Sequence, residues 1–152
     1  MMFPGCSRLI KINLVCVGTL KEDYLRKAVE EYKKRLSRFC DYIIIELPES
    51  CPAKEKQYIM KSLKGFVIAL CVEGKAVSLE GFAKALENIS LYNSVVTFVI
   101  GGSEGLDPEV KTRANLRISF SEMTFPHQLM RVIFSEQLYR AFTINNNINY
   151  HK

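Results

Sequence analysis

The last residues of the sequence are of types that can move a proton on a bound substrate. The chain ends in Tyr150, His151 and Lys152, and Glu136 and Arg140 precede them in a segment with a helical pattern. An imidazole is the side chain best suited to proton transfer near neutral pH. Chain ends are more often frayed and solvated, so these residues alone leave both interpretations open.

A glycine-rich stretch has the composition of a backbone ligand site. Residues 100–106 read Ile-Gly-Gly-Ser-Glu-Gly-Leu and directly follow an apolar run that we expect to be a strand. Glycines let backbone approach a ligand closely, and α/β folds bind ligands at the carboxyl ends of strands. The stretch has neither the Gly-Lys-Ser/Thr of a Walker loop nor a G-x-G-x-x-G fingerprint. A plain tight turn is the alternative.

A second stretch also lies between a predicted strand and a predicted helix. Residues 119–127 read Ser-Phe-Ser-Glu-Met-Thr-Phe-Pro-His. Its hydroxyls and turning backbone can face the polar edge of a ligand, while Met123 and Phe125 can form apolar walls. The alternative is an ordinary loop that leads into a helix, with Pro126 near the first turn. Spacing does not decide between the two.

The cysteines and histidines argue against a metal site. The five cysteines are odd in number, and no two have the C-x-x-C spacing that metal and redox sites favour. Cys16, Cys40 and Cys71 lie in or beside apolar runs, where a reduced thiol acts as a small hydrophobe. Only two histidines are present. We therefore expect no metal, and a reducing compartment such as the cytoplasm.

Length and composition indicate one domain over residues 1–152. Of the 152 residues, 48% are hydrophobic and 24% charged, which excludes a disordered or fibrous chain. No apolar run approaches the roughly 20 residues that cross a bilayer, and the first ten residues lack the pattern of a secretory signal. We therefore expect a cytoplasmic protein without a membrane partner. The net charge of +5 is compatible with an RNA partner but does not establish one.

Apolar runs alternate with helical patterns, which is typical of an α/β domain with a mostly parallel sheet. The predicted strands are residues 12–17, 42–47, 66–72, 95–100 and 116–120. The first four are near-continuously apolar, as strands covered on both faces should be. Helices are predicted over 21–39, over 52–63 and after a cap at Ser78.

The last predicted helix, residues 129–142, is apolar around most of its circumference. A helix of this kind needs cover on more than one side. Its own sheet covers one side, and a second copy of the chain is a natural cover for another. The pattern favours a homodimer, with an internally buried core helix as the alternative.

Taken together in this order, the motifs resemble one family. They are the glycine stretch at 101–106, Phe-Ser-Glu-Met-Thr-Phe-Pro-His at 120–127, Arg131, Glu-Gln-Leu-Tyr-Arg-Ala at 136–141 and the final Tyr-His-Lys. The set resembles the bacterial ribosomal large-subunit pseudouridine N3-methyltransferases, small SPOUT-type enzymes with a trefoil knot. Val-Cys-Val-Gly-Thr at 15–19 and Leu-Cys-Val-Glu-Gly-Lys at 70–75 also look like that family, so the resemblance covers nearly the whole chain.

The resemblance implies a knotted part at about 95–152, a homodimer with shared sites, and S-adenosylmethionine as the methyl donor. The cofactor contacts that it implies are Leu70, Gly102, Ser121, Glu122, Met123, Thr124, Phe125 and Pro126. The catalytic or substrate-positioning residues that it implies are Arg140, Tyr150 and His151.

The function hypothesis is methylation of N3 of a pseudouridine in 23S ribosomal RNA, within the assembled ribosome. His151 is the candidate base, Tyr150 orients the nucleobase, and Arg140 holds a phosphate or a developing negative charge. Two alternatives remain open. One is a non-catalytic ribosome-binding protein that keeps the cofactor pocket, and the other is a small-molecule α/β enzyme that uses the glycine stretch for a nucleotide.

Overall fold

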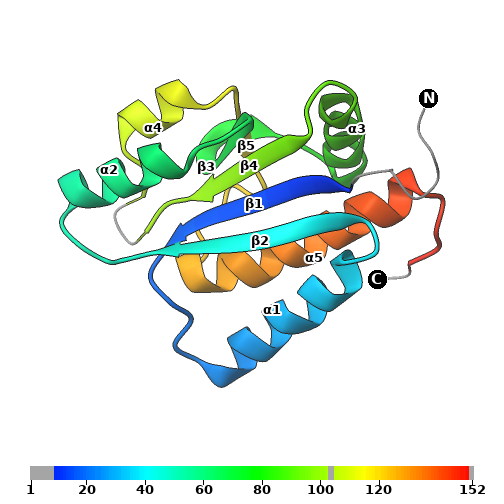
Figure 1. Cartoon of the computed structure of the whole chain (residues 1–152), viewed down its shortest axis with the longest axis horizontal. Helices are drawn as coiled ribbons and strands as arrows, with labels where there is room; N and C mark the ends of the chain where they lie inside the picture. The colour runs from blue at the N-terminus through cyan, green and yellow to red at the C-terminus, as the bar shows by residue number, and fades with distance from the viewer. Residues whose placement is uncertain (1–8, 103–104, 151–152) are drawn as a thin grey trace.

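The computed structural model of the protein describes residues 9–102 and 105–150. The role predicted for His151 therefore concerns a residue outside the described part. Strands and helices alternate along the chain, as expected (Figure 1). In chain order they are β1 (Ile10–Val17), α1 (Asp23–Leu36), β2 (Cys40–Leu47), α2 (Pro52–Ser62), β3 (Phe66–Ala76), α3 (Leu79–Ser90), β4 (Val95–Ile100), α4 (Pro108–Arg113), β5 (Leu116–Ser119) and α5 (His127–Asn145).

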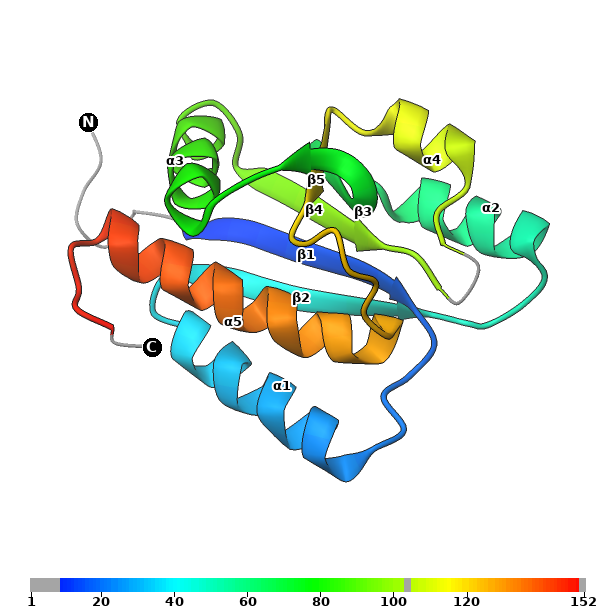
Figure 2. The same cartoon turned by 180° about the vertical axis from the view of Figure 1, so that it is seen from behind.

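The five strands form one sheet in the order β2-β1-β4-β3-β5, and every pair is parallel. Helices cover both faces (Figures 1 and 2). One face packs against α1, α3 and α5, and the other against α2 and α4. In β1, Ile12 and Leu14 belong to the first core and Val15 and Val17 to the second, because alternate side chains of a strand point to opposite faces. The predicted α/β class is confirmed.

Two details of the sheet and its helices differ from expectation. The β2 strand is not covered on both faces, since it lies at the edge of the sheet and Ile43 is 37% exposed. The α4 helix was not predicted, because it is short and buries a single residue, Val110, which leaves no periodicity to detect. Its start is nevertheless marked by the Asp107 side chain, which accepts a hydrogen bond from the Glu109 N–H at 2.8 Å.

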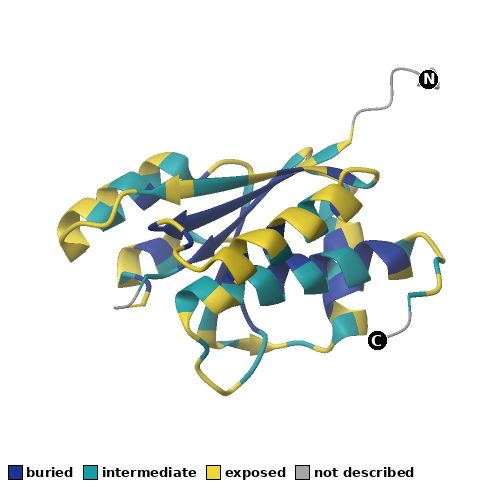
Figure 3. Ribbon diagram, turned by 90° about the horizontal axis from the view of Figure 1, so that it is seen from below, coloured by how far each residue is buried: buried dark blue, intermediate teal, exposed yellow. Residues whose placement is uncertain are grey.

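The last helix, α5, is covered mostly from within the chain. It lies against the sheet, α1 and α3, and it buries Phe134, Leu138, Ala141 and Phe142. Figure 3 shows this burial from below, with buried and intermediate residues along most of the helix. The internal cover accounts for much of the apolar circumference. A smaller outward stripe remains, on which Leu129 is 37% and Ile144 is 39% exposed.

Among the described residues, no helix is both long and apolar enough to cross a membrane.

Candidate functional site

The site predicted from two separate stretches forms one cavity of about 720 Å³. It lies beside the middle of β3 and the carboxyl ends of β4 and β5. The chain runs from β5 into α5 there (Figure 2). Of the eight predicted cofactor residues, seven line it: Leu70, Gly102, Ser121, Met123, Thr124, Phe125 and Pro126. Glu122 is the exception, because it is exposed and does not line the cavity. His127, a half-buried residue at the start of α5, also lines the cavity.

A bulge in β3 forms one wall of the cavity. Leu70 and Lys75 both pair with Ile118 of β5, so the residues between them leave the regular ladder. Cys71, Val72 and Glu73 of this bulge line the cavity. A side chain at Gly74 would bring its Cβ to 2.7 Å from the Ile118 backbone. A glycine between two charged residues, Glu73 and Lys75, at the end of an apolar run is the sequence signal that could have revealed the bulge.

The glycine stretch after β4 forms a second wall. The Gly105 N–H donates to the Gly102 carbonyl at 3.0 Å, and Gly105 has a positive φ of 79°, which favours glycine. An ideal Cβ at Gly101 would lie 2.5 Å from the Gly105 carbonyl carbon. At Gly102 the nearest atom would be Val17 Cβ at an ordinary 3.6 Å. The backbone therefore requires a glycine at 101 more strictly than at 102.

The loop from β5 to α5 is held by its own serine hydroxyls. Ser119 Oγ donates to the Ser121 carbonyl at 2.8 Å, and the Met123 N–H donates to Ser121 Oγ at 2.9 Å. Met123 is 72% exposed at the mouth. These bonds fix the course of the loop, so the cavity wall here consists of positioned backbone with apolar side chains beside it.

One ion pair lies at the cavity. Lys111 Nζ of α4 is 2.9 Å from Glu73 Oε2 of the β3 bulge. The hydrogen bond from Lys111, together with the backbone N–H of Glu73 itself, lowers the pKa of the Glu73 carboxyl. Burial raises the pKa of the neighbouring Cys71 thiol. The lowered pKa favours the ionised carboxylate of Glu73, and the raised pKa favours the protonated thiol of Cys71.

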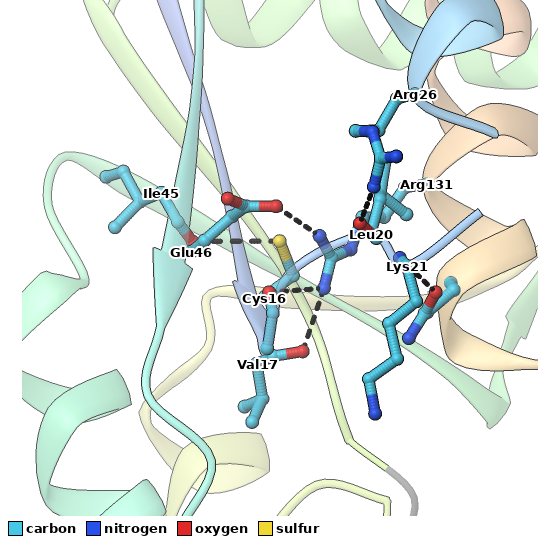
Figure 4. A network of polar contacts seen from close by, with 10 residues as sticks. Cys16, Val17, Leu20, Lys21, Arg26, Ile45, Glu46 and Arg131 are labelled. Carbon is cyan, nitrogen blue, oxygen red and sulfur yellow. Dashed lines mark hydrogen bonds and ion pairs between the residues drawn. The ribbon is translucent and has the colours of Figure 1, made fainter. Parts of the chain in front are cut away.

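A buried arginine attaches α5 to the sheet (Figure 4). Arg131 is fully buried, and its guanidinium donates to Glu46 Oε2 at 2.7 Å and to the carbonyls of Val17 and Gly18 at 2.8 Å. These acceptors are at the carboxyl ends of β1 and β2. The network explains how the helix start is aligned beside the cavity. From the sequence, Arg131 was only one member of a family motif, and its burial could not be read from the pattern.

The Cys16 thiol beside this network is a core group. Its Sγ lies 3.7 Å from the Ile45 carbonyl. Burial, which outweighs the opposing effect of Arg131, raises the pKa of Cys16 to about 12. This agrees with its predicted role as a small hydrophobe.

Two of the predicted catalytic residues, Arg140 and Tyr150, lie together in a second cluster away from the cavity. Arg140 forms an ion pair with Glu136 and lies with its guanidinium carbon 4.9 Å from the centre of the Tyr150 ring. The Tyr150 hydroxyl is 3.5 Å from Glu136 Oε2, and its ring packs edge-on against Tyr139 with centroids 4.8 Å apart. We call Glu136, Tyr139, Arg140 and Tyr150 the tail cluster.

The α1 helix contributes to the position of the tail cluster. Tyr32 lies beside Tyr139, with ring centroids 6.3 Å apart. Burial, followed by hydrogen bonding with Tyr150, raises the pKa of Tyr32 to about 12. Arg35 lies over both the Tyr32 and the Tyr139 ring. The tyrosine of the tail is thus held by two helices.

The cavity and the tail cluster are at opposite ends of α5. The cavity reaches Met130, and Arg140 follows ten residues later, which is about 15 Å along a helix that rises 1.5 Å per residue. The structure therefore does not bring Arg140 and Tyr150 to the cavity of their own chain. Among the described residues, it also contains no group of acidic, histidine and cysteine side chains that could hold a metal.

A parallel α/β sheet with a cavity at the carboxyl ends of its strands is the arrangement of an α/β protein that binds a nucleotide-like ligand. Comparison with known proteins gives the particular family. Residues 10–151 match the family described as "Predicted SPOUT methyltransferase". The chain belongs to the SPOUT methyltransferase family.

Relatives support this assignment over nearly the whole chain. A protein of Streptococcus equi subsp. zooepidemicus, named ribosomal RNA large subunit methyltransferase H, is 49% identical over 94% of this chain and 100% of its own length. A protein of the same name from Streptococcus pyogenes is 45% identical over the same shares. Among solved structures, a probable methylase family protein from Haemophilus influenzae has a similar fold. Its TM-score is 0.55 at 16% identity, over 93% of this chain and 70% of that one.

Proposed function

We propose that the protein transfers a methyl group from S-adenosylmethionine to N3 of a pseudouridine in 23S ribosomal RNA. The observation that carries this proposal is the cavity, where seven of the eight cofactor residues implied by the family resemblance lie side by side. The names of relatives that are up to 49% identical over their full length support RNA of the large ribosomal subunit as the substrate.

The cavity suits a nucleoside with an apolar surface and a polar edge. The loop from β5 to α5 offers backbone N–H and C=O groups, and Leu70, Met123 and Phe125 supply apolar contacts. When bound, S-adenosylmethionine supplies a methyl group already activated on a sulfonium, so the protein must chiefly bind and orient. Glycine at 101 keeps the wall free of a side chain that would collide with Gly105. The residues present therefore fit this cofactor.

The tail cluster is proposed to bind the nucleobase, and His151 is proposed to deprotonate it. Arg140 is oriented by Glu136 and by the Tyr150 ring, and it keeps N–H groups for a phosphate or for charge that develops on the ring carbonyls. Tyr150 is proposed to stack on the base. His151, outside the described residues, is the proposed base, because N3–H must lose its proton as the methyl arrives. General bases of this kind contribute a factor of ~10²–10⁴.

We infer that each complete site is shared between two copies of the chain. The separation of about 15 Å between the cavity and Arg140 along α5 supports this inference. So does the outward stripe of α5, where Leu129 and Ile144 are partly exposed. In a two-fold dimer that pairs the α5 helices in antiparallel fashion, the tail of one chain reaches the cavity of the other.

We also infer that the chain is knotted over about residues 95–152. The β5 strand pairs only with β3, whereas Arg131 and Ser135 of α5 bond to groups of β1 and β2. The segment between β5 and α5 therefore passes β3 and β4 before it reaches α5 (Figure 2). Knots are very rare among folds. Stretching single molecules by their termini tests the inference, since a knotted chain extends to less than its full contour length.

The assembled ribosome in the cytoplasm is the proposed substrate. The net charge of +5 gives only a modest attraction to phosphates, so recognition is expected to use the shape of a folded ribosomal surface. The test is methyl transfer from radiolabelled S-adenosylmethionine into 70S ribosomes, isolated subunits and free 23S RNA, followed by mass spectrometry of the RNA. One methyl on a pseudouridine of 23S RNA is the expected product. Cofactor and ribosome binding without transfer would instead support the non-catalytic ribosome-binding alternative.

A further inference from the structure

The cavity contains one acidic and one basic side chain. Among the described residues that line it, only Glu73 and Lys111 carry full charges, and His127 is the one imidazole. Glu73 and Lys111 come from the β3 bulge and from α4, and the cavity brings them to 2.9 Å from each other. The other walls consist of apolar side chains, a thiol, hydroxyls and backbone.

This ion pair has unused binding capacity. A carboxylate has about four lone-pair sites and an ammonium has three donors. Lys111, the N–H of Glu73 itself and the Cys71 thiol bond to the Glu73 carboxylate, which still leaves acceptor capacity on Glu73 and free donors on Lys111. The side chains of Glu73 and Lys111 are 62% and 23% exposed. Exposed ion pairs contribute little to folding, so stability is a weak reason for placing two charges at a ligand cavity.

We propose that Glu73 and Lys111 bind the amino-acid end of the methyl donor. Glu73 accepts from the α-ammonium group, and Lys111 donates to the α-carboxylate. This inference rests on the proposed function, because it requires S-adenosylmethionine in the cavity. Four charges of alternating sign then lie next to one another, and every neighbouring contact is attractive. The nucleoside end is left to the apolar and backbone walls formed by the β5–α5 loop.

The proposal predicts which ligands depend on the pair. S-adenosylmethionine and S-adenosylhomocysteine carry both charged groups, 5′-methylthioadenosine carries neither, and decarboxylated S-adenosylmethionine carries only the ammonium. Loss of one charge-assisted hydrogen bond typically costs enough to raise a dissociation constant about tenfold. The binding of these ligands can be measured without any methyl transfer.

The experiment is calorimetric titration of the full chain and of the variants Lys111→Gln and Glu73→Gln with these four ligands. Both variants should bind S-adenosylmethionine and S-adenosylhomocysteine about tenfold more weakly and bind methylthioadenosine as the wild type does. With the decarboxylated ligand, only Glu73→Gln should lose affinity. Lys56→Gln is the matched control, because it breaks an ion pair of similar length, 3.0 Å to Glu109, that does not line the cavity.

Each other outcome has a definite meaning. An equal loss for methylthioadenosine would show that the pair only shapes the cavity, and an unchanged affinity for S-adenosylmethionine in both variants would also overturn the proposal. Wild-type protein that binds methylthioadenosine as tightly as S-adenosylmethionine would refute the inference and leave the cofactor site intact. Wild-type protein that binds none of the four ligands would refute the proposed function itself, and the inference with it.

Discussion

At the scale of single residues, the two adjacent glycines after β4 offer a matched test of the cavity wall. A Cβ at Gly101 would lie 2.5 Å from the Gly105 carbonyl carbon, whereas one at Gly102 would lie 3.6 Å from Val17. We expect Gly101→Ala to lower the free energy of unfolding by roughly 1–3 kcal/mol and to weaken cofactor binding, because the wall must move. Gly102→Ala should change the stability little. Urea unfolding and calorimetric titration measure both effects, and equal stabilities for the two variants would contradict the prediction.

Arg131 carries a second prediction at the residue scale. Its side chain is fully buried and donates to Glu46, to Val17 and to Gly18. Arg131→Met keeps the apolar stem but leaves two carbonyls without their donor, and each unpaired buried group costs about 1–3 kcal/mol. We expect a loss of roughly 3 kcal/mol in the free energy of unfolding. Arg113→Met, at an exposed position of α4, is the control and should fall within about 0.5 kcal/mol of the wild type.

At the scale of elements, the sequence pattern predicts best where one physical rule dominates. The central strands β1 and β4 are buried on both faces and therefore read as near-continuous apolar runs, interrupted by Asn13 and Thr97. Ser78 was predicted to cap a helix, and its side chain accepts from the Gly81 N–H at 3.0 Å. The β3 bulge and α4 were not predicted, because each depends on what lies across from it in the fold and not on a repeating pattern.

The candidate site, too, has features that the sequence pattern indicates and features that only the fold reveals. Composition and spacing did not decide whether the glycine stretch and the 119–127 loop are plain turns or ligand-binding loops. The individual cofactor residues came from the resemblance to a family. The sheet order then shows why the two stretches meet: β3 lies between β4 and β5, so the segments after these strands end at one cavity. Glu73 and Lys111 went unnoticed because residues 38 positions apart share no local signal.

The C-terminal tail gives a prediction for one segment. Deleting residues 150–152 removes the Tyr150 ring from its contacts with Tyr139 and Arg140. These contacts are at the end of α5 away from the cavity, so we expect a loss of at most about 1 kcal/mol in stability and an unchanged affinity for the cofactor. Single-turnover methyl transfer to ribosomes should fall by a factor of ~10²–10⁴. Weakened cofactor binding in the deletion variant would show that the tail supports the cavity instead.

A substitution of His151 alone tests whether this residue is the general base. If His151 removes the N3 proton, His151→Ala should lose single-turnover rate by a factor of ~10²–10⁴ near neutral pH. Part of the rate should return as the pH rises, because N3–H ionises without help. A rate that is unchanged at every pH would reject His151 as the base. Tyr150→Phe is the companion variant, because it keeps the ring that packs on Tyr139 and removes the hydroxyl near Glu136.

At the scale of the whole molecule, α5 separates the cavity from the tail cluster that is proposed to bind the substrate. One end of this helix helps to line the cavity and the other carries the tail cluster, and a rigid helix keeps them about 15 Å apart. In the proposed dimer, two copies related by a two-fold axis would remove the separation, because an antiparallel pair of helices places unlike ends together. A dimer would then be required for activity and not only for stability.

Mixing two inactive variants tests this requirement. Thr124→Trp places a bulky side chain at a position that lines the cavity and is exposed, so it should block the cofactor while the chain still folds. The deletion of residues 150–152 keeps the cavity and lacks the tail. When equal amounts exchange subunits at random, half of the dimers are mixed and each has one intact site, so activity should recover to about a quarter of the wild-type level. Mixing either variant with itself is the control. Recovery that fails although mass spectrometry detects the mixed dimers, or a fully active wild-type monomer in sedimentation, would show that each chain uses its own tail.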